Sequence, residues 1–295
     1  MGDDDVRAYA GGRGPFGPLV GADWLAPRVG APDGPVVLDA SVGAHRGSER
    51  RIPGAQTFDI DGAFSDPSAP LPHTMLGADR FSEELSALGV NDGDTVVVYD
   101  GAGVYSSARA WWMLRAMGFD RVAVLDGGLP AWIAAGLPLE STPPAPPAAP
   151  GDFTARPRAG MFVTADEVAR ALTDPAAVVL DARSQERYAG TVAEPRPGLR
   201  AGHMPGALNL PFGSLQREGR MCPADELRGA LAARAQERER LVLSCGSGVT
   251  ACVLALAAEL AGYRGQAVYD GSWSEWGLPS GRPVETGADG LAPAP

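Results

Sequence analysis

The sequence of 295 residues contains no lysine, and all 25 of its basic residues are arginine. This absence excludes any mechanism in which a lysine side chain forms a Schiff base with a carbonyl substrate. Acidic residues outnumber basic ones, which gives a formal net charge of -11 at pH 7. Because a surface this acidic repels phosphate backbones and anionic lipids, we expect no nucleic-acid partner and no membrane partner.

Cysteine and long apolar runs are also scarce. The chain has only three cysteines, Cys222, Cys245 and Cys252, which argues against a disulfide framework and against a zinc site. The longest strongly apolar run, Ala251 to Leu260, has about half the length needed to span a bilayer. Residues 1–18 begin with acidic residues and lack an apolar core, so they predict a flexible leader and a cytoplasmic protein.

The chain repeats itself once, with four segments of the first half recurring in the same order 142 to 152 residues later. For example, VVLDAS (36–41) recurs as VVLDAR (178–183), and the proline-rich segment 141–153 lies between the two halves. Four matches in one order favour a duplicated domain over chance similarity. We therefore predict these parts: leader 1–18, first domain 19–140, linker 141–160, second domain 161–288 and tail 289–295.

Each half alternates short apolar runs with helical patterns. VVLDA, TVVVYD and RLVLSC are typical of buried parallel strands, and a helix is predicted from Thr250 to Ala261, ended by Gly262. This order predicts an α/β fold in which each domain is a parallel sheet flanked by helices on both faces. Ligands then bind at the carboxyl ends of the strands.

The segment CGSGVT (245–250) follows one of these strands and carries the strongest chemical indication. Gly246 and Gly248 allow the backbone to curl with its amides pointing inward, and the helix that begins near Thr250 aims its positive end at Cys245. This cradle would stabilise a thiolate or a persulfide anion. We therefore interpret Cys245 as a nucleophile, Cys252 as a buried apolar-helix residue and Cys222 as an incidental residue of a polar loop.

A phosphatase is a rival interpretation of a cysteine in such a loop. It would need an arginine at the end of the loop to bind a phosphate dianion, but the residue six positions after Cys245 is Ala251. The uncharged loop therefore argues against phosphoryl transfer.

From Leu19 to Glu285 the chain resembles the tandem-rhodanese-domain sulfurtransferases. The resemblance rests on CGSGVT together with GHMPGALNLPF, YDGSWSEWG, RAWWMLRAMG and EPRPGLRAGH. It implies two rhodanese-like domains. Within this family CGSGVT resembles the loop of the 3-mercaptopyruvate sulfurtransferases, whereas the thiosulfate sulfurtransferases carry a cationic loop of the type CRKGVT. Thiosulfate is a dianion that would need those cations, and mercaptopyruvate is a monoanion for which a neutral loop with a hydroxyl suffices.

The resemblance also implies roles for individual residues. Cys245 is the nucleophile and persulfide carrier, and Arg187 and Arg196 match the arginines that bind the substrate carboxylate. The relay of the family matches Asp61, His73 and Ser247, although Asp61 could instead cap a turn and His73 could be a turn histidine. The remaining loop residues match the substrate-binding loop of the family: Gly246, Gly248, Val249 and Thr250.

The first half has Asp100 at the position equivalent to Cys245, and a carboxylate there cannot accept sulfur. We expect a non-catalytic first domain that lends Asp61 and His73 to a cleft between the domains. For Arg109, framing of this cleft and a structural ion pair both remain open. His45 and His203 are expected to be structural.

The expected activity is transfer of sulfur from 3-mercaptopyruvate through a Cys245 persulfide to a thiol or cyanide, with release of pyruvate. The resemblance implies no metal or organic cofactor and a thioredoxin-like acceptor. Two alternatives remain: a thiosulfate sulfurtransferase, and a non-enzymatic rhodanese-like module that carries sulfur or binds a partner.

Overall fold

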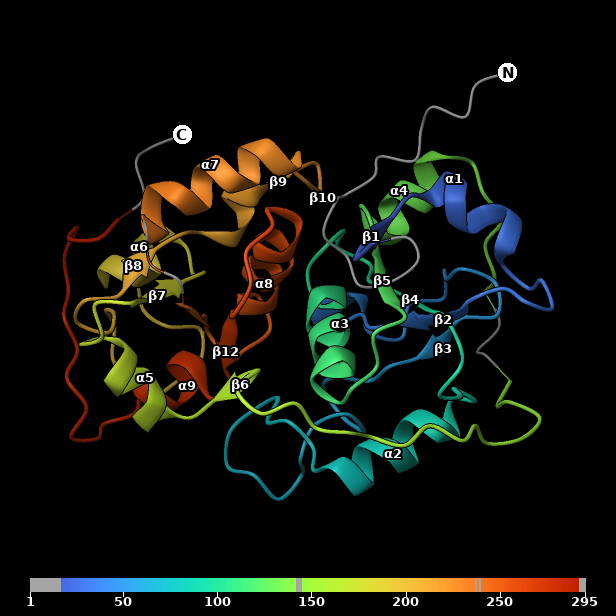
Figure 1. Cartoon of the computed structure of the whole chain (residues 1–295), viewed down its shortest axis with the longest axis horizontal. Coiled ribbons are helices and arrows are strands. Elements are labelled where there is room, and N and C mark those ends of the chain that lie inside the picture. The colour runs from blue at the N-terminus through green and yellow to red at the C-terminus, as the bar shows by residue number, and fades with distance from the viewer. Residues whose placement is uncertain (1–16, 142–144, 237, 239, 292–295) are drawn as a thin grey trace.

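The structure is a computed structural model that describes residues 17–141, 145–236, 238 and 240–291. Most of the predicted leader and the last four residues of the predicted tail lie outside this range. The chain forms two α/β units that lie side by side (Figure 1). Each unit contains one five-stranded parallel sheet, which confirms the prediction of a parallel sheet in each domain.

The first sheet has the strand order β1-β5-β4-β2-β3, and each pairing is parallel. Its central strand, β4, is fully buried and consists of valines and a tyrosine, which suits a strand covered on both faces. The strands are β1 (Leu19–Val20), β2 (Val36–Asp39), β3 (Gln56–Thr57), β4 (Val96–Tyr99) and β5 (Val122–Leu125).

The second sheet repeats this order as β6-β12-β11-β7-β8, again with parallel pairings. Strand β11 takes the central place of β4, so the residues that follow the two strands, Asp100 and Cys245, occupy equivalent positions at the carboxyl end of each sheet. The strands are β6 (Phe162–Val163), β7 (Ala177–Asp181), β8 (Leu208–Asn209), β11 (Arg240–Ser244) and β12 (Ala267–Tyr269). A separate antiparallel hairpin joins β9 (Gln216–Arg217) and β10 (Arg220–Met221).

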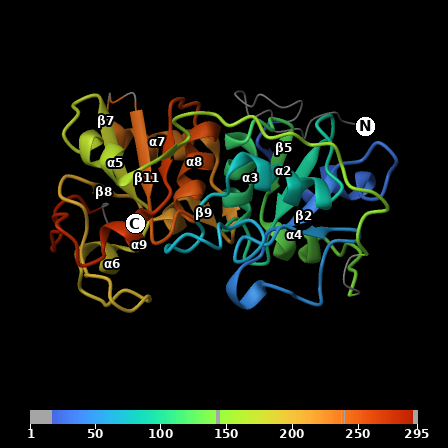
Figure 2. The same cartoon turned by 90° about the horizontal axis from the view of Figure 1, so that it is seen from below.

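Helices cover both faces of each sheet, as Figures 1 and 2 show from two directions. The first unit contains α1 (Ala22–Leu25), α2 (Ala78–Ala87), α3 (Ser107–Ala116) and α4 (Gly128–Ala134). The second contains α5 (Ala165–Ala171), α6 (Gln185–Ala189), α7 (Ala224–Ala235), α8 (Ala251–Leu260) and α9 (Ser272–Trp276). Short 3-10 turns lie at Ala26–Arg28, Gly43–His45 and Phe212–Leu215.

Helices α3 and α8 pack against each other and join the two units (Figures 1 and 2). Every residue of α8 is buried, which confirms the prediction of a buried helix, and Gly262 follows it with φ +89°. Glu259, the acidic residue within this apolar helix, forms an ion pair with Arg115 of α3, with 3.3 Å between Oε1 and Nη1. One apolar core therefore runs through both units and fixes their relative position.

The described part of the proline-rich segment packs along the first unit before it reaches β6 (Figure 1). The amide of Gly151 donates to the carbonyl of Ser86 at 2.8 Å, and the amide of Arg156 donates to that of Met117 at 2.8 Å. Phe153 between them is buried. From residue 145 to residue 161 the segment forms no helix or strand, as expected for a chain so rich in proline.

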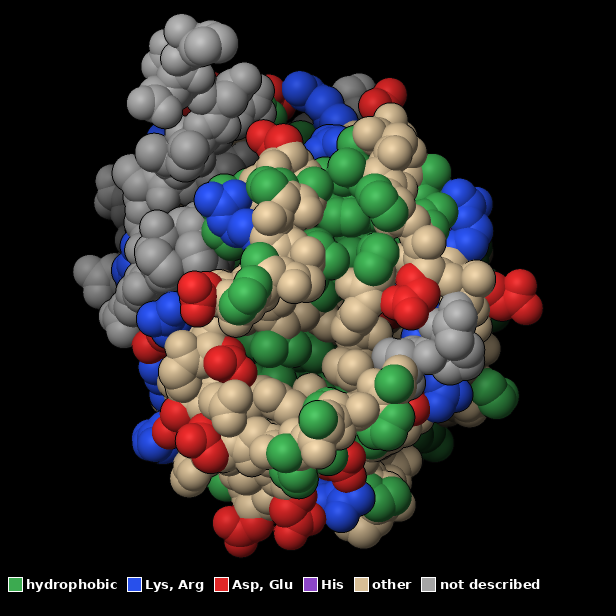
Figure 3. Space-filling model, turned by 90° about the vertical axis from the view of Figure 1, so that its right-hand side faces the viewer, with side chains coloured by type: hydrophobic (Ala, Val, Ile, Leu, Met, Phe, Trp, Pro, Cys, Tyr) green, Lys and Arg blue, Asp and Glu red, His purple; other side chains and the backbone are tan. Residues whose placement is uncertain are grey.

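Acidic and basic side chains are mixed around a central group of hydrophobic ones on the face of the first unit seen in Figure 3. Among the described residues, no helix is both long and apolar enough to cross a membrane.

Candidate active site

The loop of residues 245–250 connects β11 to α8 and is held by the turn that leads into α9. The amide of Cys245 donates to Ser272 Oγ at 3.1 Å, and its carbonyl accepts from the amide of Trp273 at 3.0 Å. The carbonyl of Gly246 accepts from the amide of Ser274 at 2.8 Å. The segment YDGSWSEWG therefore fixes the loop in place.

The two glycines of the loop make room for different neighbours, and only Gly248 also has a left-handed backbone. Gly248 has φ +76°, and a Cβ atom there would lie 2.8 Å from the carbonyl oxygen of Asp270 and 2.9 Å from Arg109 Nη1. A Cβ atom at Gly246 would lie 3.1 Å from Arg187 Nη2. Glycine at position 246 therefore lets the Arg187 guanidinium lie close against the loop, and a larger residue would require this guanidinium to shift.

The amides of residues 246–250 donate to no acceptor within the described parts of the chain. In the first unit the equivalent loop already holds a carboxyl group, because Asp100 accepts from the amides of Ala102, Tyr105 and Ser107 at 2.8 to 2.9 Å. Burial nevertheless raises the pKa of Asp100 above its usual value. The first loop thus fills its own anion cradle, whereas the cradle around Cys245 is left for a bound group.

His73 of the first unit reaches the loop of the second. Its Nδ1 atom lies 2.9 Å from Ser247 Oγ, and its Nε2 atom lies 2.9 Å from Asp61 Oδ1. The second oxygen of Asp61 accepts from the amide of Gly43 at 3.3 Å. The structure therefore brings together all three residues of the predicted relay, across the boundary between the units.

Burial lowers the pKa of His73 below its ordinary value, and the hydrogen bond and charge of Asp61 oppose this effect. The imidazole is therefore neutral near pH 7. With the Nε2 proton donated to the carboxylate, Nδ1 is the atom that accepts from the Ser247 hydroxyl.

Arg109 is fully buried on α3 and connects His73 to the loop, because its side chain hydrogen-bonds to the backbone of both. Its Nη2 atom donates to the carbonyl of His73 and to Asp270 Oδ1, each at 2.7 Å, and its Nη1 atom donates to the carbonyl of Gly248 at 3.3 Å. Burial alone would lower the pKa of Arg109, but the charge and hydrogen bonds of its neighbours, chiefly Asp270, outweigh burial and raise the pKa. Arg109 thus both forms an ion pair and frames the cleft.

A cavity of about 450 Å³ opens above Cys245, and residues of both units line it. Every predicted site residue lines this cavity except Gly248, whose backbone instead shapes the loop. Sequence reasoning missed four residues of the lining: Val42, Gly43, Tyr105 and Pro195. Tyr105 was missed because nothing marks it in the motif VVVYDGAGVYSS. The pKa of the Tyr105 phenol is raised, mainly by burial and to a smaller extent by the charge of Cys245.

The two predicted carboxylate-binding arginines differ in their surroundings. Arg187 is paired with Glu194, whereas Arg196 has no hydrogen bond or ion pair to any described residue. Glu194 is only 1% exposed and was also missed by sequence reasoning. Its position in the sequence between Arg187 and Arg196 is an indication that could have been noticed.

The other cysteines and histidines lie outside this arrangement. Cys252 is fully buried, as predicted, and burial raises its pKa to about 12. Cys222 follows the hairpin and is also buried rather than part of an exposed polar loop, because its side chain packs into the core beside Leu215. His203 is structural, as expected, since it stacks on Tyr188 with 3.9 Å between ring centroids. His45 lines a smaller cavity beside Asp100.

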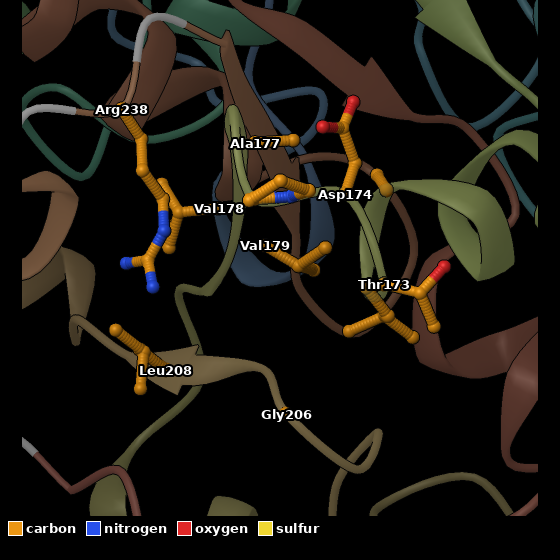
Figure 4. A pocket seen from close by; sticks show the side chains of 11 residues that line it. Thr173, Asp174, Ala177, Val178, Val179, Gly206, Leu208 and Arg238 are labelled. Atoms are coloured by element: carbon orange, nitrogen blue, oxygen red, sulfur yellow. The ribbon is translucent and has the colours of Figure 1, made fainter.

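A further cavity, of about 220 Å³, lies at the start of β7 and contains none of the predicted site residues. Figure 4 shows Arg238 pointing toward Leu208 and Val178, while the carboxylate of Asp174 points away. In the described parts of the chain, no group of three or more His, Cys, Asp or Glu side chains is placed to hold a metal ion.

Comparisons with known proteins agree with the repeated fold. Residues 22–135 and 164–278 each match the model of the rhodanese-like domain. The chain is 40% identical over 278 residues to the 3-mercaptopyruvate sulfurtransferase of Escherichia coli K12, covering 90% of this chain and 97% of that protein. It is also 40% identical over 275 residues to the human 3-mercaptopyruvate sulfurtransferase, covering 88% and 91%.

Among solved structures, the chain is similar to the crystal structure of SseA from Escherichia coli, which is described as a 3-mercaptopyruvate sulfotransferase with the rhodanese fold. The two share 37% sequence identity with a TM-score of 0.77, over 88% of this chain and 99% of that one.

Proposed function

This chain belongs to the family of proteins with rhodanese-like domains, and we propose that it acts as a 3-mercaptopyruvate sulfurtransferase with Cys245 as its nucleophile. The observation that carries the proposal is the chain of hydrogen bonds Asp61–His73–Ser247, which ends in the uncharged loop of Cys245. Such a chain moves protons, and the removal of sulfur from mercaptopyruvate requires a proton to be moved.

The reaction begins when the Cys245 thiolate attacks the sulfur atom of 3-mercaptopyruvate. A sulfur–sulfur bond forms, the carbon–sulfur bond breaks, and its electron pair leaves on carbon as the enolate of pyruvate. The thiol proton of the donor passes to Ser247 and His73, and the same hydrogen bonds return a proton to the enolate carbon. The products are pyruvate and a Cys245 persulfide, which makes this ping-pong covalent catalysis.

The rest of the cavity suits this chemistry. The free amides of the loop would stabilise first the thiolate and then the persulfide anion. Arg187 and Arg196, which line the same cavity, would bind the donor carboxylate. The persulfide then gives its outer sulfur to an acceptor thiol or to cyanide. We propose a thioredoxin-like protein as the acceptor and the cytoplasm as the location.

Two alternatives are weaker on physical grounds. A thiosulfate sulfurtransferase would be expected to offer cations beside Cys245, and residues 246–250 carry none. A non-enzymatic sulfur carrier or binding module would be expected to have a replaced nucleophile or a broken loop. That description fits the first domain with Asp100, and not the second.

The test is to measure kcat/KM for 3-mercaptopyruvate and for thiosulfate, with the same acceptor and at the same pH. A strong preference for mercaptopyruvate supports the proposal. A preference for thiosulfate would identify the chain as a thiosulfate sulfurtransferase. If neither donor is turned over, the non-enzymatic carrier or binding module is the alternative that remains.

A further inference from the structure

A buried carboxylate stands directly behind one of the two arginines of the cavity. Glu194 Oε2 accepts from Arg187 Nη2 at 2.5 Å, and Glu194 Oε1 accepts from Arg187 Nε at 3.2 Å. Its Oε1 atom also accepts from Arg183 Nη1 at 2.9 Å, although Arg183 is already bound on another side by Asp181. Because Asp181 already neutralises Arg183, the negative charge of Glu194 is available to balance Arg187.

This contact fixes which part of Arg187 can meet a ligand. Glu194 occupies the edge of the guanidinium formed by Nε and Nη2. The guanidinium also lies against the loop, since Nη2 and Nη1 lie 3.1 and 3.8 Å from the Cβ position of Gly246, and Nη1 takes no part in the contact with Glu194. Arg187 thus lines the same cavity as Cys245 while the negative charge of Glu194 balances its own positive charge.

The ion pair with Glu194 lowers the positive charge that the cavity offers to an anionic ligand. Arg187 is paired with Glu194, and Arg196 is the lining arginine without a partner among the described residues. Asp61, the one acidic side chain in the lining, faces the cavity from the first domain and is bound to His73. Glu194 thus offsets one of the two positive charges that the lining arginines offer a ligand, and a dianion loses more electrostatic stabilisation by this than a monoanion does.

We propose that Glu194 is the specificity-determining residue that disfavours dianionic sulfur donors, by balancing the charge of Arg187 in the donor cavity. This inference rests on the proposed function. It extends the argument from the uncharged loop, because it assigns part of the donor selectivity to the ion pair of Glu194 with Arg187 and not to residues 246–250 alone. Glu194 acts through Arg187 and touches no reacting atom.

The test is Glu194→Gln, which removes the charge but keeps the length and one acceptor oxygen of the side chain. We expect the ratio of kcat/KM for thiosulfate to kcat/KM for mercaptopyruvate to rise on the order of tenfold, because a nearby unit charge is worth at least that in a partly buried site. Glu194→Asp keeps the charge and shortens the side chain. It should lower activity with both donors and leave the ratio unchanged.

Glu186→Gln is the matched control, because it removes one negative charge next to Arg187 in α6, at an exposed position outside the cavity. We expect its ratio to equal that of the unmodified protein. The inference would be overturned if Glu194→Gln lowered kcat/KM equally for both donors. It would also be overturned if Glu186→Gln raised the ratio as much as Glu194→Gln does. Failure of the unmodified protein to turn over mercaptopyruvate would instead refute the proposed function.

Discussion

His73 lies in the first domain, and its Nδ1 atom is 2.9 Å from the Oγ atom of Ser247 in the second. The contact is supported by Arg109 and Asp270, which hold the backbone at His73 and two residues after it. Arg109 binds the carbonyl of His73, and the amide of Met75 donates to Asp270 Oδ2 at 2.9 Å. His73 itself has φ +59°, a left-handed conformation that this support maintains.

The relay predicts that His73→Gln lowers kcat with mercaptopyruvate by about a hundredfold to ten-thousandfold, the usual contribution of a general acid–base group. Ser247→Ala should have a similar effect, and the double variant should lose little more than either single one, because the two groups act as a unit. Steady-state kinetics measure this. His45→Gln, which changes an exposed histidine outside the relay, is the control, and an equal loss there would refute the assignment.

The environment of His73 predicts the acid side of the pH profile. Since burial lowers its pKa, the imidazole should stay neutral below pH 6.5, its ordinary value, and kcat/KM should fall only at lower pH. Asp61→Asn removes the group that raises this pKa, so the acid limb should move further down. A limb that moves up in Asp61→Asn would contradict this relationship.

The cysteines should differ sharply in reactivity. Burial raises the pKa of Cys252 to about 12, and burial also raises the pKa of Cys222, so both remain protonated at about pH 8. Cys245 lines the cavity, and we expect iodoacetamide to modify it alone in the folded protein. Peptide mass spectrometry measures this, with the denatured protein as the control in which all three react. Labelling of Cys252 at the same rate as Cys245 would contradict the structure.

The ion pair behind the loop predicts a loss of stability. Arg109→Met should destabilise the protein by about 3 to 5 kcal/mol, because it leaves Asp270 without its buried partner. The fall in the thermal unfolding midpoint should be accompanied by a loss of kcat, since His73 and the loop lose a shared support. Arg156→Met, at an exposed ion pair with Asp92, should change neither quantity. An unchanged midpoint in Arg109→Met would show that the pair is dispensable.

The repeat in the sequence was enough to predict two domains of one fold, because four matched segments recur in the same order, and apolar runs such as VVVY are typical of buried parallel strands. The Cys245 loop followed from its glycines and from its place between a strand and a helix. These are local properties of neighbouring residues, which a sequence records directly.

Contacts between distant residues were harder to predict. Arg109 left two interpretations open, and only the approach of α3 to the second domain shows that both hold. Glu194 and Tyr105 went unnoticed because their importance comes from what folds against them, Arg187 in one case and the donor cavity in the other. Cys222 lies among polar neighbours in sequence yet is buried, because its loop folds back onto Leu215.

The most direct test of the account is a single turnover of 3-mercaptopyruvate without an acceptor. One equivalent of pyruvate should be released, and the peptide containing Cys245 should gain the mass of one sulfur atom, while Cys245→Ser does neither and Cys222→Ala does both. Pyruvate released without sulfur on Cys245, or released by Cys245→Ser, would contradict the claim that this cysteine carries the sulfur.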